Sequence, residues 1–151
     1  FSVAITASGA LYTWGTNIFG ELGHGDHTLR SRPERVAALQ QERVRCVASG
    51  ESHTLAVTES GKLYTWGLNK SGQLGRKANW PGHASSLPGL VEFVDPVRAV
   101  AAGSSHAIVV TRDGRAFGFG WGRGDARLGL SLTDHQRTPL EYPELRVAAT
   151  W

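Results

Sequence analysis

A unit of about 52 residues occurs three times in this chain of 151 residues, and this repetition constrains the fold more than any other feature. The copies extend approximately over residues 1–50, 51–103 and 104–151. Each begins near a Ser-Gly or Asp-Gly pair, continues through an aromatic-Gly and a Leu-Gly pair, and then reaches a proline. These markers are Ser8-Gly9, Ser60-Gly61 and Asp113-Gly114; Trp14-Gly15, Trp66-Gly67 and Phe119-Gly120; Leu22-Gly23, Leu74-Gly75 and Leu128-Gly129; and Pro33, Pro88 and Pro139.

Each copy contains about four short strand signals and no sustained helical period. The runs 53–58 and 106–111 are almost continuously apolar, which is typical of strands covered on both faces. The Ser-Gly or Asp-Gly pair after such a run predicts a tight hairpin. The prolines indicate an outer strand, where a missing N–H is tolerated. Four antiparallel strands per tandem repeat predict an all-β fold built from about three β-propeller blades, with little helix.

Composition limits the cellular location and the classes of ligand that are expected for this chain. The chain carries 19 glycines, as an architecture rich in tight turns requires, and no apolar run long enough to span a bilayer. Its one cysteine, Cys46, excludes an internal disulfide and lies in an apolar strand, so we expect an inert thiol and an intracellular location, cytoplasm or nucleus. The net charge of +3 is too small and scattered to indicate nucleic acid as a specific ligand.

Two motifs carry a resemblance to a known family. The segments Gly15-Thr-Asn17-Ile-Phe-Gly20-Glu-Leu-Gly23 and Gly67-Leu-Asn69-Lys-Ser-Gly72-Gln-Leu-Gly75 resemble the signature of the regulator of chromosome condensation repeat. Gly50-Glu-Ser-His53 and Gly103-Ser-Ser-His106 resemble its second signature. The resemblance covers essentially the whole chain and implies a seven-bladed propeller, of which three blades are present here. The third copy departs from it, because its loop is one residue longer and lacks the asparagine, so we expect a different loop shape there.

Most repeated residues are expected to be structural. This group comprises Gly15, Gly67, Gly120, Trp14, Trp66, His53 and His106. We expect Trp14 and Trp66 to be largely buried, both histidines to bond to backbone, and Asn17 and Asn69 to bond their own turns. The cluster His24-Gly-Asp26-His27 matches no established zinc spacing, and the chain has no phosphate loop, nucleophile elbow or carboxylate pair. We therefore predict no metal, no cofactor and no catalytic residue.

Partner binding is predicted for residues that the repeat does not require. The second copy is longer between its Leu-Gly pair and its proline than the other two. A tryptophan beside two cations suits a binding hot spot, although Trp80 could equally cover its own blade. The third copy offers a similar loop. The predicted partner-binding residues are Arg76, Lys77, Trp80 and His83 in the second copy, and Trp121, Arg123, Asp125 and Arg127 in the third.

Three functions remain to be weighed. The first is a non-enzymatic scaffold that mediates protein–protein interaction within a longer multi-repeat protein or a large complex. The second, implied by the resemblance, is nucleotide exchange on a Ran-type small GTPase together with chromatin binding, although no β-wedge insertion is found in these copies. The third is ultraviolet sensing, which the absence of a Gly-Trp-Arg-His-Thr motif disfavours. Because the chain opens mid-strand at Phe1 and three blades leave two faces uncovered, we expect the remaining blades to come from the same polypeptide.

Overall fold

The computed structural model describes residues 1–77, 84–93, 95–122, 128–129 and 134–148, and these residues are almost entirely strand and turn. One turn of 3-10 helix, η1 (Ala37–Leu39), is the only helical element in these ranges, so the expected scarcity of helix is confirmed for them. The strands are β1 (Ser2–Ile5), β2 (Leu11–Gly15), β3 (Arg30–Arg35), β4 (Val44–Ser49), β5 (His53–Thr58), β6 (Leu63–Leu68), β7 (Ala84–Val91), β8 (Val97–Ala102), β9 (His106–Thr111), β10 (Arg115–Gly120) and β11 (Gln136–Arg146).

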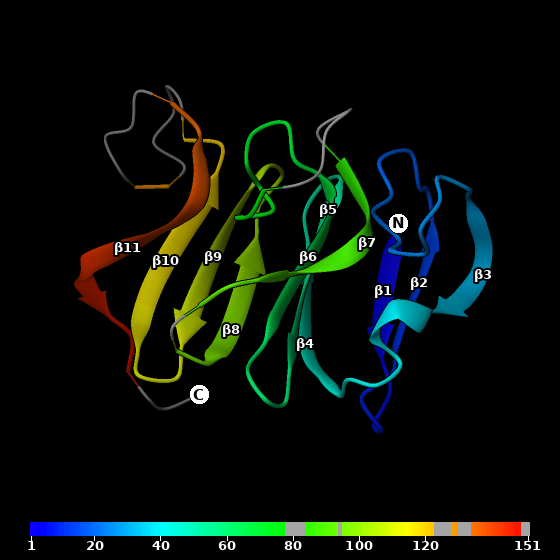
Figure 1. Ribbon diagram of the computed structural model, residues 1–151, viewed down its shortest axis with the longest axis horizontal. Coiled ribbons are helices and arrows are strands. Elements are labelled where there is room, and N and C mark those ends of the chain that lie inside the picture. The colour runs from blue at the N-terminus through cyan, green and yellow to red at the C-terminus, as the bar shows by residue number, and fades with distance from the viewer. Residues whose placement is uncertain (78–83, 94, 123–127, 130–133, 149–151) are drawn as a thin grey trace.

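The strands form three antiparallel sheets, which lie side by side as blades (Figure 1). The first blade is β1-β2-β3, the second is β4-β5-β6-β7 and the third is β8-β9-β10-β11. We call β4 and β8 the inner strands, because they contact each other across the boundary between the second and third blades. The prolines lie in the strands at the opposite edge, β3, β7 and β11, as the sequence predicts. The predicted propeller blades are therefore confirmed.

The blades are out of phase with the sequence repeat. Strand β4, which ends the first copy, does not join the first blade but pairs with β5, with Cys46 opposite Val57. The third blade consequently has four strands and the first has three. The third repeat copy is cut short just after its Arg146-Val-Ala-Ala149 segment, which predicts the reverse, that the last sheet lacks a strand. That prediction is wrong because each blade takes its inner strand from the end of the preceding copy.

The three predicted hairpins are present, at the lower end of the view in Figure 1. Their glycines have a φ between 84° and 88°, and each donates its N–H to the carbonyl of a threonine three residues earlier. A side chain would strain this left-handed backbone, which explains the Ser-Gly and Asp-Gly pairs. Each glycine carbonyl also accepts the N–H of a valine, namely Val44, Val97 or Val147. We call this end of the blades the hairpin end and the opposite end the loop end.

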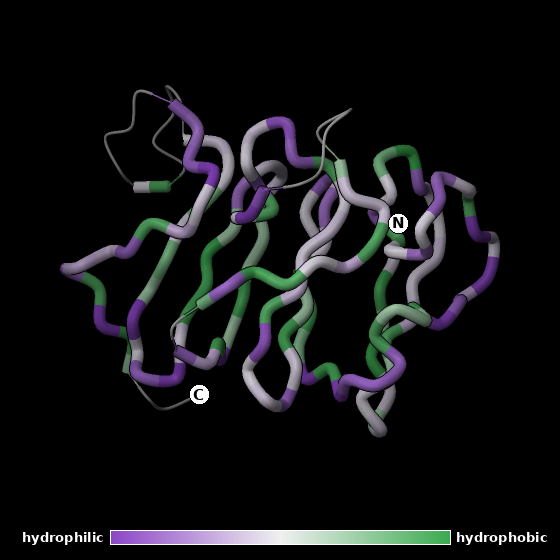
Figure 2. The backbone as a smooth tube through the Cα atoms, viewed as in Figure 1, coloured by the Kyte–Doolittle hydropathy of each residue, from purple (hydrophilic) through white to green (hydrophobic). Residues whose placement is uncertain are grey.

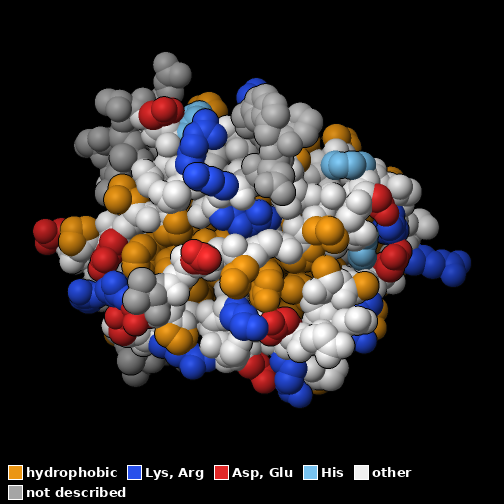
Figure 3. All heavy atoms as spheres, in the orientation of Figure 1, with side chains coloured by type: hydrophobic (Ala, Val, Ile, Leu, Met, Phe, Trp, Pro, Cys, Tyr) orange, Lys and Arg blue, Asp and Glu red, His pale blue; other side chains and the backbone are white. Residues whose placement is uncertain are grey.

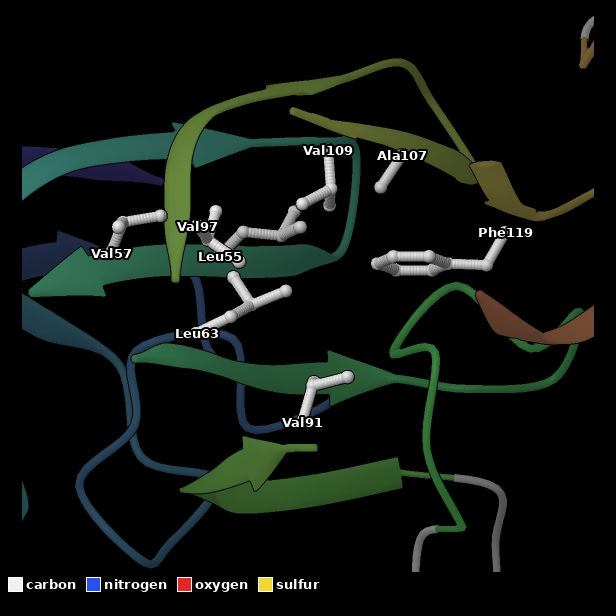
Figure 4. Close-up of a cluster of buried hydrophobic side chains, with 8 residues drawn as sticks. All are labelled: Leu55, Val57, Leu63, Val91, Val97, Ala107, Val109 and Phe119. Carbon is white, nitrogen blue, oxygen red and sulfur yellow. The ribbon is translucent and has the colours of Figure 1, made fainter. Parts of the chain in front are cut away.

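The hydrophobic core lies between blades. Leu55 and Val57 of β5 meet Val97 and Val109 of the third blade in a cluster that also contains Leu63, Val91, Ala107 and Phe119 (Figure 4). A second cluster, formed by Leu11, Val36, Leu39, Val44, Ala56 and Trp66, joins the first and second blades. Strand β5 is buried on both faces as predicted. Strand β9 is buried on one face only, because no further blade lies against Ile108 and Val110 in the described structure.

An aromatic ring from each following blade rests on the Leu-Gly pair of the blade before it. Trp66 is fully buried, and a Cβ added at Gly23 would come within 2.8 Å of its Nε1. Phe119 is also fully buried and lies on Gly75 in the same way. Trp14 is only partly buried and thus less enclosed than predicted. A ring at this position packs on the Leu-Gly pair of the preceding blade, and the described structure contains no blade before the first one, so Trp14 has no such partner here.

The hydropathy of the residues along the chain varies with their place in the blades. The apolar segments run along the strands and the polar segments lie mainly in the turns at both ends of the blades (Figure 2). On the face viewed in Figure 3, hydrophobic side chains gather across the middle, with charged side chains around them. Over the residues that the structure describes, no helix has the length and apolar character needed to cross a bilayer.

Candidate partner-binding surface

The loops that carry the first family motif are held by their own side chains. Asn17 accepts a hydrogen bond at Oδ1 from the N–H of Leu22 (3.0 Å) and donates from Nδ2 to the carbonyl of Asp26 (3.0 Å). In the second copy Asn69 accepts from the N–H of Leu74 (3.0 Å) and donates to the carbonyl of Arg76 (3.2 Å). The prediction that these asparagines bond their own turns is confirmed.

The glutamate or glutamine of the same motif closes the loop from the other side. Glu21 accepts the N–H of Phe19 (2.7 Å), and Gln73 accepts the N–H of Ser71 (2.8 Å). Both side chains are buried, and each satisfies a backbone donor of its own loop. The first two motif loops are thus rigid platforms at the loop end of the blades.

The histidines of the second motif are packing groups. The ring of His53 is fully buried and lies against Gly50, where it occupies the space that a side chain would need; His106 lies against Gly103 in the same way. Neither ring nitrogen of His53 forms a hydrogen bond of ordinary geometry with the described residues, although the backbone of His106 interacts with the ring and slightly opposes the fall of its pKa. Burial, followed by the charge of His106, lowers the pKa of His53 to about 4. The imidazole is therefore neutral at physiological pH.

Arg76 and Lys77 begin the segment in which the second copy is longer. The Arg76 guanidinium donates to the Thr65 carbonyl (2.7 Å), to Thr65 Oγ1 (3.1 Å) and to Ser85 Oγ (3.1 Å). Burial lowers the pKa of this half-buried guanidinium. Lys77 is exposed beside it. Arg76 therefore fixes the direction in which the chain leaves the blade, while Lys77 is available to a partner.

A groove runs from these residues toward the third blade. It encloses about 520 Å³ and is lined by Gly75, Arg76, Lys77, Gly89, Leu90, Glu92, Thr138 and Pro139. Strand β7 of the second blade and strand β11 of the third form its sides. The groove is wide enough for a few side chains of a peptide, and its walls combine apolar surface with charges of both signs.

Trp121 begins the other predicted loop, at the end of β10. It is partly buried, and its ring lies 4.7 Å from that of His135, centroid to centroid, with a 37° tilt between the planes. The remaining predicted partner-binding residues, Trp80, His83, Arg123, Asp125 and Arg127, lie outside the described residues. The structure thus brings Arg76 and Lys77 together at one groove and places Trp121 on the adjacent blade.

The cluster His24-Gly-Asp26-His27 is used within the loop. His24 Nε2 lies 3.0 Å from Thr13 Oγ1, and His27 Nδ1 lies 3.1 Å from the Ile18 carbonyl. The hydrogen bond from Arg30, supported by the N–H of Thr28, lowers the pKa of Asp26 to about 2. In these contacts His24, Asp26 and His27 each bond to a different partner, and the contacts do not bring the three side chains around a common point. Elsewhere, burial raises the pKa of the free Cys46 thiol, which keeps it protonated.

Sequence reasoning missed three exposed apolar side chains on the first two blades. Ile18 is 67% exposed and Leu29 63%, and Leu87 of the second blade is 50% exposed beside Gly25. The sequence held a sign of this exposure. The second copy has Lys70 at the position that corresponds to Ile18, so this position of the repeat faces solvent and does not require an apolar residue. Ile18 and Leu29 lie in the segment between β2 and β3, at the loop end of the blades.

Comparison with known proteins identifies the family. The family model for the regulator of chromosome condensation (RCC1) repeat matches residues 8–57 and 60–110, and a second model of the same description matches residues 44–73 and 97–124. The chain belongs to the RCC1 repeat family. The two matches of the first model begin at or beside the Ser-Gly markers on which the copies were defined.

Relatives within the RCC1 repeat family differ widely in their overall size. The chain is 41% identical over 142 residues to the human E3 ubiquitin-protein ligase HERC2, covering 92% of this chain and 3% of that protein. It is 40% identical over 152 residues to the ultraviolet-B receptor UVR8 of Arabidopsis thaliana, covering 99% of this chain and 32% of the receptor. The chain therefore spans at most about a third of these two relatives.

A solved structure agrees with the fold. Prp20p from Saccharomyces cerevisiae, which is described together with its binding to Gsp1p and histones, superposes with a TM-score of 0.80 at 31% identity. The match covers 92% of this chain and 35% of Prp20p. The RCC1 propeller fold expected from the two motifs is thereby confirmed, and the interaction role is supported at the level of a protein-binding propeller domain.

Proposed function

We propose that this chain is part of a non-enzymatic RCC1-type propeller scaffold that binds protein partners at the loop end of its blades. The observation that carries the proposal is the groove between the second and third blades. There, Arg76 is anchored by three hydrogen bonds, Lys77 is exposed, and the chain enters the segment by which the second copy exceeds the others. A rigid base beneath a variable loop is a common arrangement for recognition.

Binding rather than catalysis is supported by the diversity of the relatives. HERC2 is a ubiquitin ligase and UVR8 is a light receptor, yet both contain a region at least 40% identical to this chain. A module shared by proteins of such different activities contributes something other than the chemistry of either. We therefore assign no reaction, cofactor or catalytic residue to these blades.

The test is capture of partners by the complete protein as bait, compared with a Trp80→Ala variant. We expect Trp80→Ala to weaken binding of the captured partner without lowering the melting temperature. A Leu145→Ala variant serves as the control, because it removes an exposed apolar side chain near the hairpin end of β11, away from the loop end. If Trp80→Ala lowers stability while the folded fraction binds as before, the tryptophan only covers its own blade and this site assignment fails.

A second candidate is guanine-nucleotide exchange on a Ran-type small GTPase, with chromatin binding. It is favoured by the 31% identity to Prp20p, the protein described with its binding to Gsp1p and histones. The measurement is release of a fluorescent guanine nucleotide from the GTPase in the presence of the complete protein. Acceleration would establish exchange, whereas binding without acceleration would leave the scaffold role alone.

We also propose that further repeats of the same polypeptide cover the two outer blade faces, and that the protein is intracellular, in the cytoplasm or nucleus. The free thiol of Cys46 supports a reducing compartment. The contact of an aromatic ring with the glycine supports the further blades. A Cβ at Gly75 would meet Phe119 at 2.9 Å, whereas a Cβ at Gly129 would meet none of the described residues within 4 Å.

This difference provides a test for the neighbouring blade. Gly75 and Gly129 have nearly equal φ values of 63° and 62°, so alanine imposes similar backbone strain at both. In the complete protein, Gly129→Ala should destabilise as much as Gly75→Ala if another aromatic ring covers Gly129. A clearly smaller effect at Gly129 would show that the face stays open.

A further inference from the structure

At the hairpin end of the blades, three arginines lie on or beside the strands of the second and third blades: Arg45 and Arg112 bond across the boundary between these blades, and Arg98 bonds on the far side of the third blade. Arg45 is the second residue of inner strand β4, Arg98 is the second residue of inner strand β8, and Arg112 directly follows β9. We call these three residues the arginine row. The row is at the hairpin end, whereas the loops of the first family motif and Lys77 are at the loop end.

Each arginine of the row is fixed by a backbone carbonyl. Arg45 donates to the carbonyl of Arg98, and Arg98 donates to the carbonyl of Ala148 (3.0 Å). Arg112 donates back across the boundary to the carbonyl of Glu59 (2.6 Å). A carbonyl orients a guanidinium but does not neutralise it, and a guanidinium has five N–H donors. Each side chain therefore retains its full charge and further donors.

Other cations at the hairpin end differ from the row in this respect. Lys62 pairs with Glu42 (2.7 Å), and Arg115 pairs with Asp113 (2.8 Å) and with Asp95. Within the described ranges, no carboxylate forms an ion pair with Arg45, Arg98 or Arg112.

The carboxylate of Glu59 does not compensate the row. Glu59, whose backbone carbonyl holds Arg112, has its carboxylate engaged by Arg43 at 3.0 Å. The Nε of Arg98 is buried and has no acceptor among the residues described. The row is thus a local concentration of positive charge with unused donors, in a protein whose net charge is only +3.

We propose that the arginine row binds an acidic segment of a partner protein. Carboxylates fit guanidinium groups with paired hydrogen bonds, and the row passes from the inner strand of one blade to that of the next, as an extended peptide could. Nucleic acid is disfavoured, because three arginines neutralise few phosphates and the resulting electrostatic attraction to a nucleic-acid backbone weakens as salt rises. This inference deepens the proposed scaffold function, on which it rests, by naming a second surface and the chemistry of its partner.

The experiment measures binding of a fluorescent peptide of twelve residues, alternating Glu and Gly, to the complete protein by anisotropy at low and physiological salt. The triple variant Arg45→Gln/Arg98→Gln/Arg112→Gln should bind at least tenfold more weakly. The matched control Arg32→Gln/Arg35→Gln/Lys70→Gln removes the same charge from exposed positions elsewhere and should bind within twofold of the unaltered protein.

The experiment also includes a double variant and a comparison with duplex DNA. Because Arg98 is half-buried, the double variant Arg45→Gln/Arg112→Gln is measured as well, and it decides the outcome if the triple variant melts at a lower temperature. The proposal is overturned if the row variants and the control lose affinity equally, or if duplex DNA is bound more tightly than the peptide in a row-dependent way. Capture of partners through Trp80 at the loop end is a separate readout, so either proposal can fail without the other.

Discussion

Replacing Trp66 tests how neighbouring blades are held together. The side chain is fully buried, packs on Gly23 of the first blade and donates its Nε1–H to the Glu21 carbonyl at 2.8 Å. Trp66→Ala removes the ring and leaves a cavity at the boundary, which for a core aromatic costs about 3–5 kcal/mol. Trp66→Phe keeps most of the ring and should cost about 1–2 kcal/mol, since mainly the hydrogen bond is lost.

The Glu21 carbonyl sharpens this prediction because it has a second donor. Thr54 Oγ1 donates to the same oxygen at 2.9 Å. Either single change, Trp66→Phe or Thr54→Ala, leaves the carbonyl with one partner, whereas the double variant leaves a buried oxygen with none. The double variant should therefore lose about 1 kcal/mol or more beyond the sum of the single variants.

The measurement is urea unfolding of the complete protein followed by circular dichroism, which does not depend on the fluorescence of the tryptophan removed. The matched control is Trp14→Ala, which deletes the same ring at the corresponding position of the first blade, where it is only partly buried. A cost below about 1 kcal/mol for Trp66→Ala, or simple additivity in the double variant, would refute the reasoning.

Three further predictions follow from other contacts. The folded-state pKa of His53 is about 4, below its ordinary value of 6.5, so the unfolded chain binds the proton first as the pH falls. Unfolding free energy should therefore decrease between pH 6.5 and 4 by roughly 3 kcal/mol and lose this dependence in His53→Asn, as urea titrations at several pH values would show. Asn69→Ala should cost about 1–3 kcal/mol through the buried N–H of Leu74, while Lys70→Ala changes the melting temperature little. Residues 1–151 expressed alone should self-associate in sedimentation, because Ile108 and Val110 lie on a face without a neighbour in the described structure; a monodisperse, cooperatively unfolding monomer would contradict this.

The repeat made the fold predictable from sequence. Hairpin glycines, edge prolines and buried runs recur at fixed spacing, so three weak local signals reinforce one another. Contacts between copies were harder to foresee. The phase of the blades depends on which sheet Val44–Ser49 joins, and the burial of Trp14 depends on a neighbour that its own copy does not contain.

The candidate sites were less predictable, for a related reason. Sequence alone marked Arg76 as a binding residue, but its guanidinium is largely engaged by Thr65 and Ser85. Conversely, Arg45 and Arg98 recur after a valine in two copies, yet their shared lack of a carboxylate becomes visible only when strands from different copies are side by side. Charge compensation is a property of three-dimensional neighbours and not of spacing.

The offset between copies and blades determines what a protease cut would do. A cut between Gly50 and Glu51, where two copies meet in sequence, falls inside the second blade. Strand β4 would remain attached by its ladder to β5, so the two fragments should stay together after cleavage. A cut between β7 and β8 instead separates complete sheets, which only side-chain packing and a few cross-boundary bonds then join. The fragments should therefore dissociate less readily after a cut at the boundary between two sequence copies than after a cut between two blades.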